Sequence, residues 1–230
     1  MRSAAPDTAK SMILVADKPF IAWQLEWLGA QGVSDVVLSI GYKGDQIRSY
    51  VKDGQPFGVR VRYVDEGDRL LGTAGALRLA ADANVLDDRF FVLYGDSYLD
   101  VSLTKVWNHF GRQSRDALMT VYRNSNVGEV SNVVFDGTLV TRYEKNRSQL
   151  PNDMVFVDYG LLVLSLSLIE DYLAPGVEAD LSNLLQTLSE DGNLAGYEAT
   201  ARFHEIGSPQ GLRTLERELS RSSNADRAGN

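Results

Sequence analysis

The sequence predicts an α/β fold with a doubly wound, mostly parallel, Rossmann-like mixed sheet and an added antiparallel hairpin region. Helix and strand periodicities alternate through the first half of the chain, which is typical of a parallel sheet with right-handed crossovers. One strand segment, FFVLY, is apolar throughout, as strands buried on both faces are. Beyond residue 130, a glycine turn separates two strand-like segments, which indicates antiparallel strands beside the parallel core.

The first half of the chain begins with FIAWQLEWLGAQG, residues 20–32, which places Ile21, Leu25 and Leu28 on one helical face. It ends at a glycine suited to a helix C-cap. The strand VSDVVLSIG follows. The other expected elements of this half are, in order, a helix at 43–54, a strand at 59–66, a helix at 73–83, a strand at 89–96, a helix at 102–113 and a strand at 117–123.

The second half is expected to start with a hairpin over residues 132–145, which turns at Asp136-Gly137. A strand at 154–166, a helix at 180–192, a strand at 194–207 and a closing helix at 208–220 follow. Ser208 is the expected N-cap of the closing helix, with Pro209 at its first position. Because no repeat or linker interrupts the chain, residues 1–220 are expected to form a single domain and residues 221–230 a disordered tail.

Composition excludes several classes of function. The net charge of −8 and the pI near 4.8 argue against a nucleic-acid binder or a protein of anionic membranes. The chain has no cysteine and only two histidines, which excludes thiolate chemistry and leaves little material for a histidine metal cage. No apolar run approaches the length of roughly 20 residues that a membrane span needs. A cytoplasmic location is therefore expected.

The segment FFVLYGDSYLD delivers a carboxylate, Asp96, at the carboxyl end of a buried strand. Ligands of open α/β sheets bind at that edge, and Gly95 permits close approach of a ligand to the backbone. A carboxylate there is a natural oxygen ligand for Mg²⁺ that carries phosphates. The alternative is that Gly-Asp-Ser only turns the chain and caps the next helix.

A second candidate segment is the flexible turn Leu71-Gly72-Thr73-Ala74-Gly75, which directly precedes a helix. Such a turn lets backbone groups approach a flat ligand, or an anion at the helix N-terminus. Its spacing is that of neither the P-loop nor the dinucleotide fingerprint. The alternative is an ordinary loop with Thr73 as the helix cap.

Taken in order, six segments resemble the sugar-1-phosphate nucleotidyltransferase family, which makes nucleotide sugars. AKSMILVADKPFIAWQLEWL is similar to the family element that holds a phosphate-binding lysine, here Lys10. LLGTAGAL resembles the base-contacting segment, residues 71–75, and VLYGDS the strand that ends in the metal-binding Asp96. FHEIGSPQGL resembles the segment with the second metal-binding carboxylate, here Glu205.

The remaining two segments resemble the sugar side of the family's site. RYEKN implies that Glu144 holds sugar hydroxyls and that Lys145 binds the sugar phosphate. VDYGLLVL implies that Asp158 faces the sugar. Asn132 stands where the family usually has a glycine against the sugar, and Glu205 replaces the usual aspartate.

The resemblance implies transfer of a nucleotidyl group from a nucleoside triphosphate to a sugar 1-phosphate, with Mg²⁺, by a monomer or homo-oligomer. Within the family, the sequences of these segments are most similar to heptose- or mannose-1-phosphate guanylyltransferases of lipopolysaccharide or capsule synthesis. Uridylyltransferases acting on MurNAc- or glucose-1-phosphate are an alternative. The resemblance names Lys10, Asp96 and Lys145 as the catalytic residues.

The start of the sequence departs from the family. Met1 and Arg2 align with the end of the family's Gly-rich signature AGGxGTRLRP, which places Arg2 at the nucleotide. The first strand and the Gly-rich loop are therefore expected to be missing and the natural protein to be longer. The alternative is a non-catalytic relative that binds nucleotide sugars or has a regulatory role.

Overall fold

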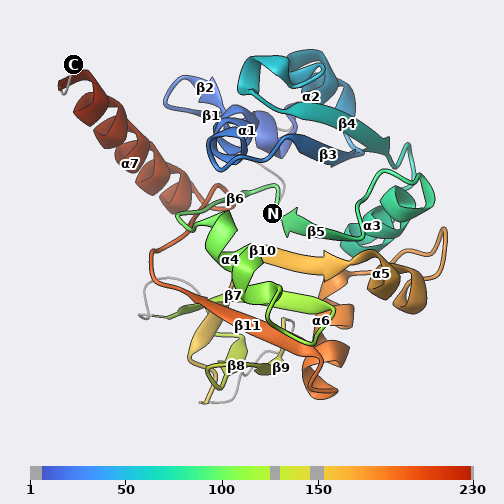
Figure 1. The fold of residues 1–230 in the computed structure, drawn as a ribbon. Coiled ribbons are helices and arrows are strands. Elements are labelled where there is room, and N and C mark those ends of the chain that lie inside the picture. The colour runs from blue at the N-terminus through green and yellow to red at the C-terminus, as the bar shows by residue number, and fades with distance from the viewer. Residues whose placement is uncertain (1–6, 125–129, 146–152, 229–230) are drawn as a thin grey trace.

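The computed structural model describes residues 7–124, 130–145 and 153–228, with only the backbone described for residues 221–228. Its helices and strands form an α/β fold with helices on both faces of a mixed sheet (Figure 1). This confirms the predicted α/β class. None of the described helices combines the length and the apolar character that crossing a membrane requires.

The largest sheet has the order β11-β7-β10-β8-β9, with β5 also paired to β10. The strand β10 pairs antiparallel with β5, β7 and β8, whereas β11 pairs parallel with β7. Among the described strands this sheet is therefore more antiparallel than predicted, because the long strand β10 returns through its middle. Its strands are β5 (Arg89–Leu93), β7 (Ala117–Arg123), β8 (Val133–Phe135), β9 (Val140–Tyr143), β10 (Phe156–Ser165) and β11 (Leu194–Ala199).

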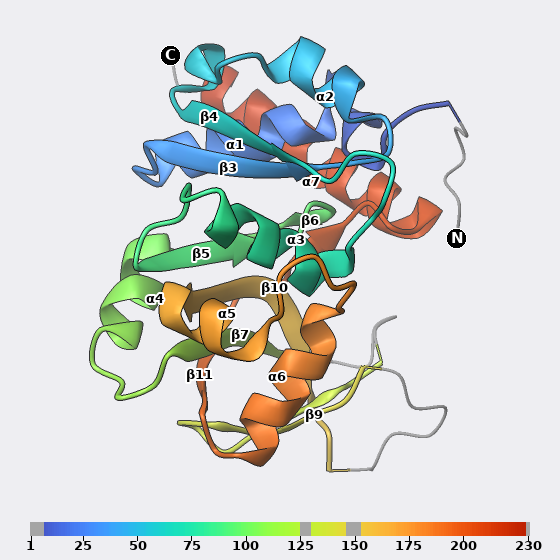
Figure 2. The ribbon, with the colours of Figure 1, turned by 90° about the vertical axis from the view of Figure 1, so that its right-hand side faces the viewer.

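Alternate residues of β10 enter two different cores. Leu161 and Val163 belong to the core that also contains apolar residues of α1 (Phe20–Ala30) and α4 (Leu103–Phe110). Leu162 and Leu164 belong to the core formed with helices α3 (Gly72–Asp82), α5 (Leu166–Tyr172) and α6 (Leu181–Glu190), which lie together on one face in Figure 2. Most positions of β10 are apolar, as is typical of strands buried on both faces, and the exceptions are Asp158, Gly160 and Ser165.

A second, two-stranded parallel sheet is formed by β3 (Asp35–Ile40) and β4 (Arg60–Asp65), connected through α2 (Gly44–Val51) and η2 (Gln55–Phe57). Within the described residues β3 pairs only with β4, and β5 pairs only with β10. Both β3 and β5 line one cavity of about 1440 Å³, called the central cavity below. The two strands run in the same direction in Figure 2. Within the described residues, β3 and β5 therefore each leave one edge without a strand partner.

The predicted hairpin at Asp136-Gly137 is confirmed. Oδ1 of Asp136 accepts hydrogen bonds from the backbone N–H groups of Thr138 and Leu139 at 2.8 and 2.7 Å. Gly137 has a φ of +101°, which glycine adopts without strain. The turn residues alone therefore carry enough information to place β8 and β9 side by side.

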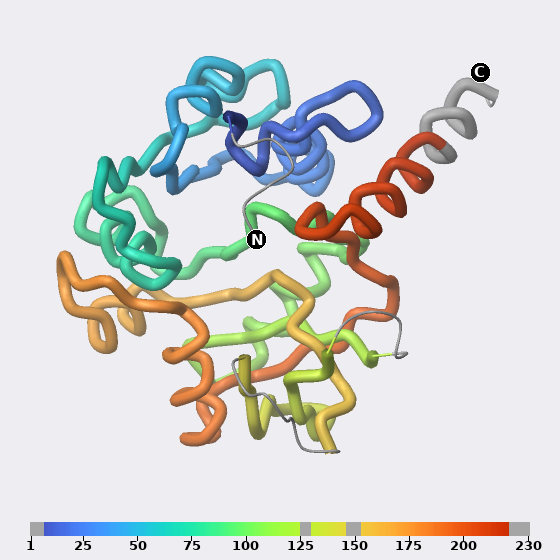
Figure 3. Tube along the Cα trace, turned by 180° about the vertical axis from the view of Figure 1, so that it is seen from behind, coloured from blue at the N-terminus to red at the C-terminus, as the bar shows by residue number. Residues whose placement is uncertain are grey.

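Four short strands, one 3-10 helix and the C-terminal helix complete the described fold. They are η1 (Lys10–Met12), the pair β1 (Leu14–Val15) and β2 (Lys18–Pro19), the pair β6 (Ser97–Tyr98) and β12 (His204–Glu205), and α7 (Pro209–Ala228). Oγ of Ser208 accepts a hydrogen bond from Gly211 N–H at 3.0 Å, as expected of a capping residue. The helix continues past Ser220, where the sequence predicted its end. Figure 3 shows it leaving the body of the molecule.

Candidate active site

The central cavity collects most of the residues that the sequence singled out. Those at its wall are Lys10, Gly72, Thr73, Asp96, Asn132, Lys145, Asp158 and Glu205. Leu71, Ala74, Gly75 and Glu144 do not line it, and Arg2 lies outside the described residues. Residues from both ends and from the middle of the chain thus border one space.

The carboxylates of Asp96 and Glu205 are brought together by a small pair of strands. Glu205 in β12 lies opposite Ser97 in β6, and Ile206 N–H donates to the carbonyl of Asp96 at 3.0 Å. Nζ of Lys10 lies 2.6 Å from Oδ2 of Asp96. A Cβ atom built on Gly207 would lie 3.4 Å from Oε2 of Glu205 and 3.5 Å from Nζ of Lys10. Two carboxylates and one ammonium therefore border the same small region.

This set of donors fits Mg²⁺ better than it fits a structural metal. Among the described residues there is no group of three or more histidine, aspartate or glutamate side chains that could hold a metal ion. Magnesium in proteins is usually bound through one or two carboxylates together with phosphate oxygens of the substrate. Asp96 and Glu205 are two carboxylates of this kind, and both line the central cavity.

The turn that carries Asp96 is fixed by Gln24, which the sequence analysis missed. Nε2 of Gln24 donates to the carbonyls of Tyr94 and Ser97, at 3.0 and 2.8 Å. These carbonyls stand on either side of Gly95-Asp96, so one side chain holds both ends of the turn. The available signal was a polar residue three positions after Ile21, within the predicted apolar face of this helix. In the structure Gln24 is only 6% exposed.

Gly95 and Gly72 differ in what surrounds them. A Cβ atom added to Gly95 would meet no other atom within 4 Å, so the protein itself does not require glycine there. Gly72 has a φ of +72°, and an added Cβ would lie 2.6 Å from the carbonyl oxygen of Ala179. Gly72 is therefore required by packing and backbone conformation, whereas Gly95 leaves open space beside Asp96.

The turn at residues 71–75 is bonded to the segment before α6. The N–H groups of Ala74 and Gly75 donate to the carbonyl of Ala179 at 2.9 and 3.3 Å, and Ala179 N–H donates to the carbonyl of Leu71 at 2.8 Å. These two amides are thus occupied within the protein. Glu66, also missed from the sequence, accepts a hydrogen bond from Leu71 N–H at 2.7 Å.

Thr73 does not cap its own helix, which corrects the alternative drawn from the sequence. Leu71 is the N-cap residue of α3 and makes no side-chain cap bond. Oγ1 of Thr73 instead accepts a hydrogen bond from Leu181 N–H at 2.8 Å and donates to Asp180 at 3.3 Å. The hydroxyl therefore fastens the start of α6 to the turn.

Asp158 is held by protein groups at the wall of the central cavity. Tyr94 Oη donates to Oδ2 of Asp158 at 2.7 Å, and Gly160 N–H donates to Oδ1 at 2.9 Å. Asp158 N–H donates to Oδ1 of Asn132 at 3.1 Å. Burial raises the pKa of Asp158, although the hydrogen bonds from Tyr94 and Gly160 and the charge of Lys145 oppose this rise. Burial and the neighbouring Asp158 charge also raise the pKa of Tyr94 well above its ordinary value.

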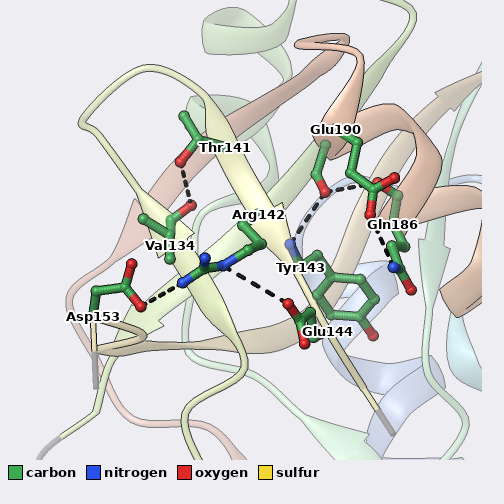
Figure 4. A network of polar contacts seen from close by, with 9 residues as sticks. Val134, Thr141, Arg142, Tyr143, Glu144, Asp153, Gln186 and Glu190 are labelled. Carbon is green, nitrogen blue, oxygen red and sulfur yellow. Dashed lines mark hydrogen bonds and ion pairs between the residues drawn. The ribbon is translucent and has the colours of Figure 1, made fainter. Parts of the chain in front are cut away.

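Glu144 and Lys145 follow β9 and differ in exposure. Glu144 is buried, and its Oε1 lies 3.9 Å from Nε of Arg142, whose guanidinium also pairs with Asp153 (Figure 4). Lys145 is exposed at the cavity wall, with Nζ 4.0 Å from Oδ1 of Asp180. The role of Glu144 in holding sugar hydroxyls stays a prediction, because its side chain does not line the cavity.

Comparisons with known proteins identify the family of the chain. Residues 5–218 match the family described as nucleotidyl transferase. A UTP–glucose-1-phosphate uridylyltransferase of Synechocystis is 29% identical over 86% of this chain and 54% of its own length. A D-glycero-alpha-D-manno-heptose 1-phosphate guanylyltransferase of Campylobacter jejuni is 33% identical over 46% of each chain. The chain therefore spans about half the length of these curated relatives.

A solved structure shares the fold over nearly the whole chain. HddC from Yersinia pseudotuberculosis, complexed with GMP-PN, superposes with a TM-score of 0.78 at 25% identity and covers 95% of this chain and 93% of its own. Both kinds of comparison confirm the family that the ordered segments of the sequence resemble. The chain belongs to the nucleotidyl transferase family.

Proposed function

We propose that this protein transfers a guanylyl group from GTP to heptose 1-phosphate or mannose 1-phosphate, giving a nucleotide sugar and pyrophosphate. The observation that carries the proposal is the grouping of Lys10, Asp96 and Glu205 in one region of the central cavity, whose wall also includes Lys145. The guanylyltransferase of Campylobacter and the GMP-PN complex of HddC support the choice of base and sugar.

The reaction joins two anions, so the first requirement is to overcome their repulsion. A phosphate oxygen of the sugar 1-phosphate attacks the α-phosphorus in line. The new P–O bond forms as the bond to pyrophosphate breaks. No proton transfer is required, so positioning and charge neutralisation supply the catalysis. In a protein of net charge −8, this neutralisation must come from a few local cations.

We assign these cations to the two lysines of the site. Lys10 would neutralise the triphosphate, and Lys145 would bind the phosphate of the sugar. A magnesium ion held by Asp96 and Glu205 would supply further positive charge at the α-phosphate. Gln24 would keep the carboxylate of Asp96 aimed at that position, because it fixes both ends of the turn.

One other enzymatic candidate has an observation in its favour. Uridylyl transfer to glucose- or MurNAc-1-phosphate is favoured by the similarity to the Synechocystis enzyme, which extends over 86% of this chain. A non-catalytic protein that binds nucleotide sugars is the alternative of another class, and the test below separates it from both enzymes.

The test is pyrophosphate release from GTP, UTP, CTP, dTTP and ATP, each paired with heptose-, mannose-, glucose- and MurNAc-1-phosphate. Each pair is measured in Mg²⁺ and in EDTA. Magnesium-dependent release with GTP and heptose or mannose 1-phosphate is expected. Release with UTP would favour the uridylyl alternative. Binding of a nucleotide sugar without release would favour the non-catalytic one, and neither release nor binding would overturn all three.

A further inference from the structure

We propose that Asp180 is a positioning residue that couples the nucleotide segment, residues 71–75, to the sugar-phosphate lysine, Lys145. The inference rests on the proposed function, because that proposal assigns the two roles being coupled. Asp180 is the N-cap residue of α6 and was not singled out from the sequence.

One carboxylate oxygen of Asp180 contacts both halves of the proposed site. Its Oδ1 lies 3.3 Å from Oγ1 of Thr73 and 4.0 Å from Nζ of Lys145. The same oxygen accepts a hydrogen bond from Ser182 N–H at 2.8 Å, which fixes its position at the start of α6. Thr73 and Lys145 both line the central cavity. A single atom therefore stands between the segment assigned to the nucleotide and the cation assigned to the sugar phosphate.

The backbone beside Asp180 is hydrogen-bonded to the turn, whereas the side chain of Lys145 is half-exposed. On either side of Asp180, Ala179 O accepts from Ala74 and Gly75, and Leu181 N–H donates to Thr73. Lys145 has a long side chain that is 47% exposed, and such a chain loses rotamer entropy when it is fixed. A fixed carboxylate beside its ammonium reduces the number of conformations left to lose when the phosphate binds.

Asp180 also carries the charge that this role needs. Burial raises its pKa, but the hydrogen bonds from Ser182, the charge of Lys145 and the Thr73 hydroxyl outweigh burial and hold the pKa below its ordinary value. Asp180 is thus a carboxylate at neutral pH. Its charge also repels an incoming phosphate. If orientation of Lys145 dominates, removing the charge should raise KM for the sugar 1-phosphate. If repulsion of the phosphate dominates, removing the charge should lower this KM.

The test is Asp180→Asn, which removes the charge but keeps an oxygen that caps α6, since asparagine caps helices as well as aspartate does. We expect KM for the sugar 1-phosphate to rise on the order of tenfold, while KM for the nucleotide, kcat and Tm stay close to wild type. Asp180→Glu, which restores the charge, should recover part of the loss. In a Lys145→Met background, Asp180→Asn should have no further effect, because the group it positions is gone.

Two matched variants separate this role from general effects. Asp171→Asn removes an exposed carboxylate from the neighbouring helix α5, and Ser102→Ala removes the cap of α4. Neither should change KM for the sugar 1-phosphate. An unchanged or lowered KM in Asp180→Asn, or an equal rise in Asp171→Asn, would overturn the inference.

Calorimetric titration of mannose 1-phosphate into the protein with GTP in EDTA gives a binding constant that does not need turnover. A tenfold weaker Kd in Asp180→Asn would support the coupling even if the wild-type protein released no pyrophosphate. If the wild-type protein turns over and Asp180→Asn has the same KM and Kd, the coupling is wrong and the proposed function is not affected. A wild-type protein that neither turns over nor binds contradicts the proposed function and the coupling together.

Discussion

Lys10 and Asp96 form an ion pair of 2.6 Å between Nζ and Oδ2, although 86 residues separate them in the sequence. The pair joins the 3-10 helix η1 to the turn that follows β5. Their side chains are 47% and 37% exposed, and exposed ion pairs contribute only about 0–1 kcal/mol to stability. The fold therefore has little need of this pair, which leaves both groups available for a ligand.

Asp96→Asn is expected to reduce pyrophosphate release by about 100-fold or more, because it removes a charged ligand from the proposed magnesium site. Tm should change little, since the lost ion pair is exposed. Steady-state release and thermal unfolding measure the two effects. Asp100→Asn is the matched control, because Asp100 is an exposed carboxylate on the other side of the short strand β6. Full turnover in Asp96→Asn would remove Asp96 from the proposed metal site.

Gly95→Ala is expected to leave stability unchanged while lowering kcat/KM for the nucleotide by roughly tenfold, because the methyl group would enter the space beside Asp96. Gly72→Ala should do the reverse and destabilise the protein by more than about 1 kcal/mol, since alanine there is strained and meets Ala179 O. Urea unfolding and initial rates of both variants test the contrast. Equal activity of Gly95→Ala and wild type would show that no ligand approaches this glycine.

Gln24→Leu is expected to destabilise the protein by about 1–3 kcal/mol, because two backbone carbonyls lose their buried donor. Activity per folded molecule should also fall, since the turn that carries Asp96 loses its support. Gln186→Leu is a suitable comparison, because Gln186 is exposed and bonds only along its own helix, to Glu190. Stability is measured by urea unfolding, and a loss in Gln24→Leu no larger than in Gln186→Leu would contradict this role.

Asp136 should make the stability of the hairpin depend on pH. The N–H groups of Leu139 and Thr138 lower its pKa, so the folded state binds this proton less tightly than the unfolded state does. Its stabilisation is therefore present above the ordinary aspartate pKa of about 3.9 and lost as pH falls through the lower folded value. At pH 7, Asp136→Ala should cost about 1 kcal/mol, since water screens this exposed group.

The comparison for this effect is Asp136→Asn, which keeps a neutral acceptor. Urea unfolding between pH 7 and pH 3 should show wild type losing stability relative to Asp136→Asn only below about pH 4. Parallel curves for the two proteins over this range would contradict the assignment.

The sequence predicted those parts of the fold that depend on neighbouring residues. The Asp136-Gly137 turn and the Ser208 cap are local signals, and the structure confirms both. Antiparallel strands were predicted beside the parallel core, but the place of β10 between β5 and β7 was not, because it depends on how the chain returns across the sheet. The helix α5 was also not predicted from its short segment.

The residues of the candidate site also differ in whether neighbouring sequence or distant contacts define their roles. Asp96 could be placed from the end of an apolar strand segment, although β5 is half-buried in the structure and not buried on both faces as predicted. Asp180 and Gln24 act through partners that are 107 and 70–73 residues away. Nothing in one sequence reports such distant contacts. The glycines of residues 71–75 illustrate a further limit, because a turn suited to a ligand and a turn packed against Ala179 contain the same residues.

The central cavity between β3 and β5 has a consequence for cooperativity. In the described part of the chain no ladder of hydrogen bonds connects these strands, so the β3–β4 unit is tied to the larger sheet by apolar side chains. Native-state hydrogen exchange should therefore find two cooperative units, with amides of β3 and β4 exchanging through a lower-energy opening than those of β7 and β10. Equal protection of the amides in β3–β4 and in β7 and β10 would mean that side-chain packing alone makes the two sheets open together.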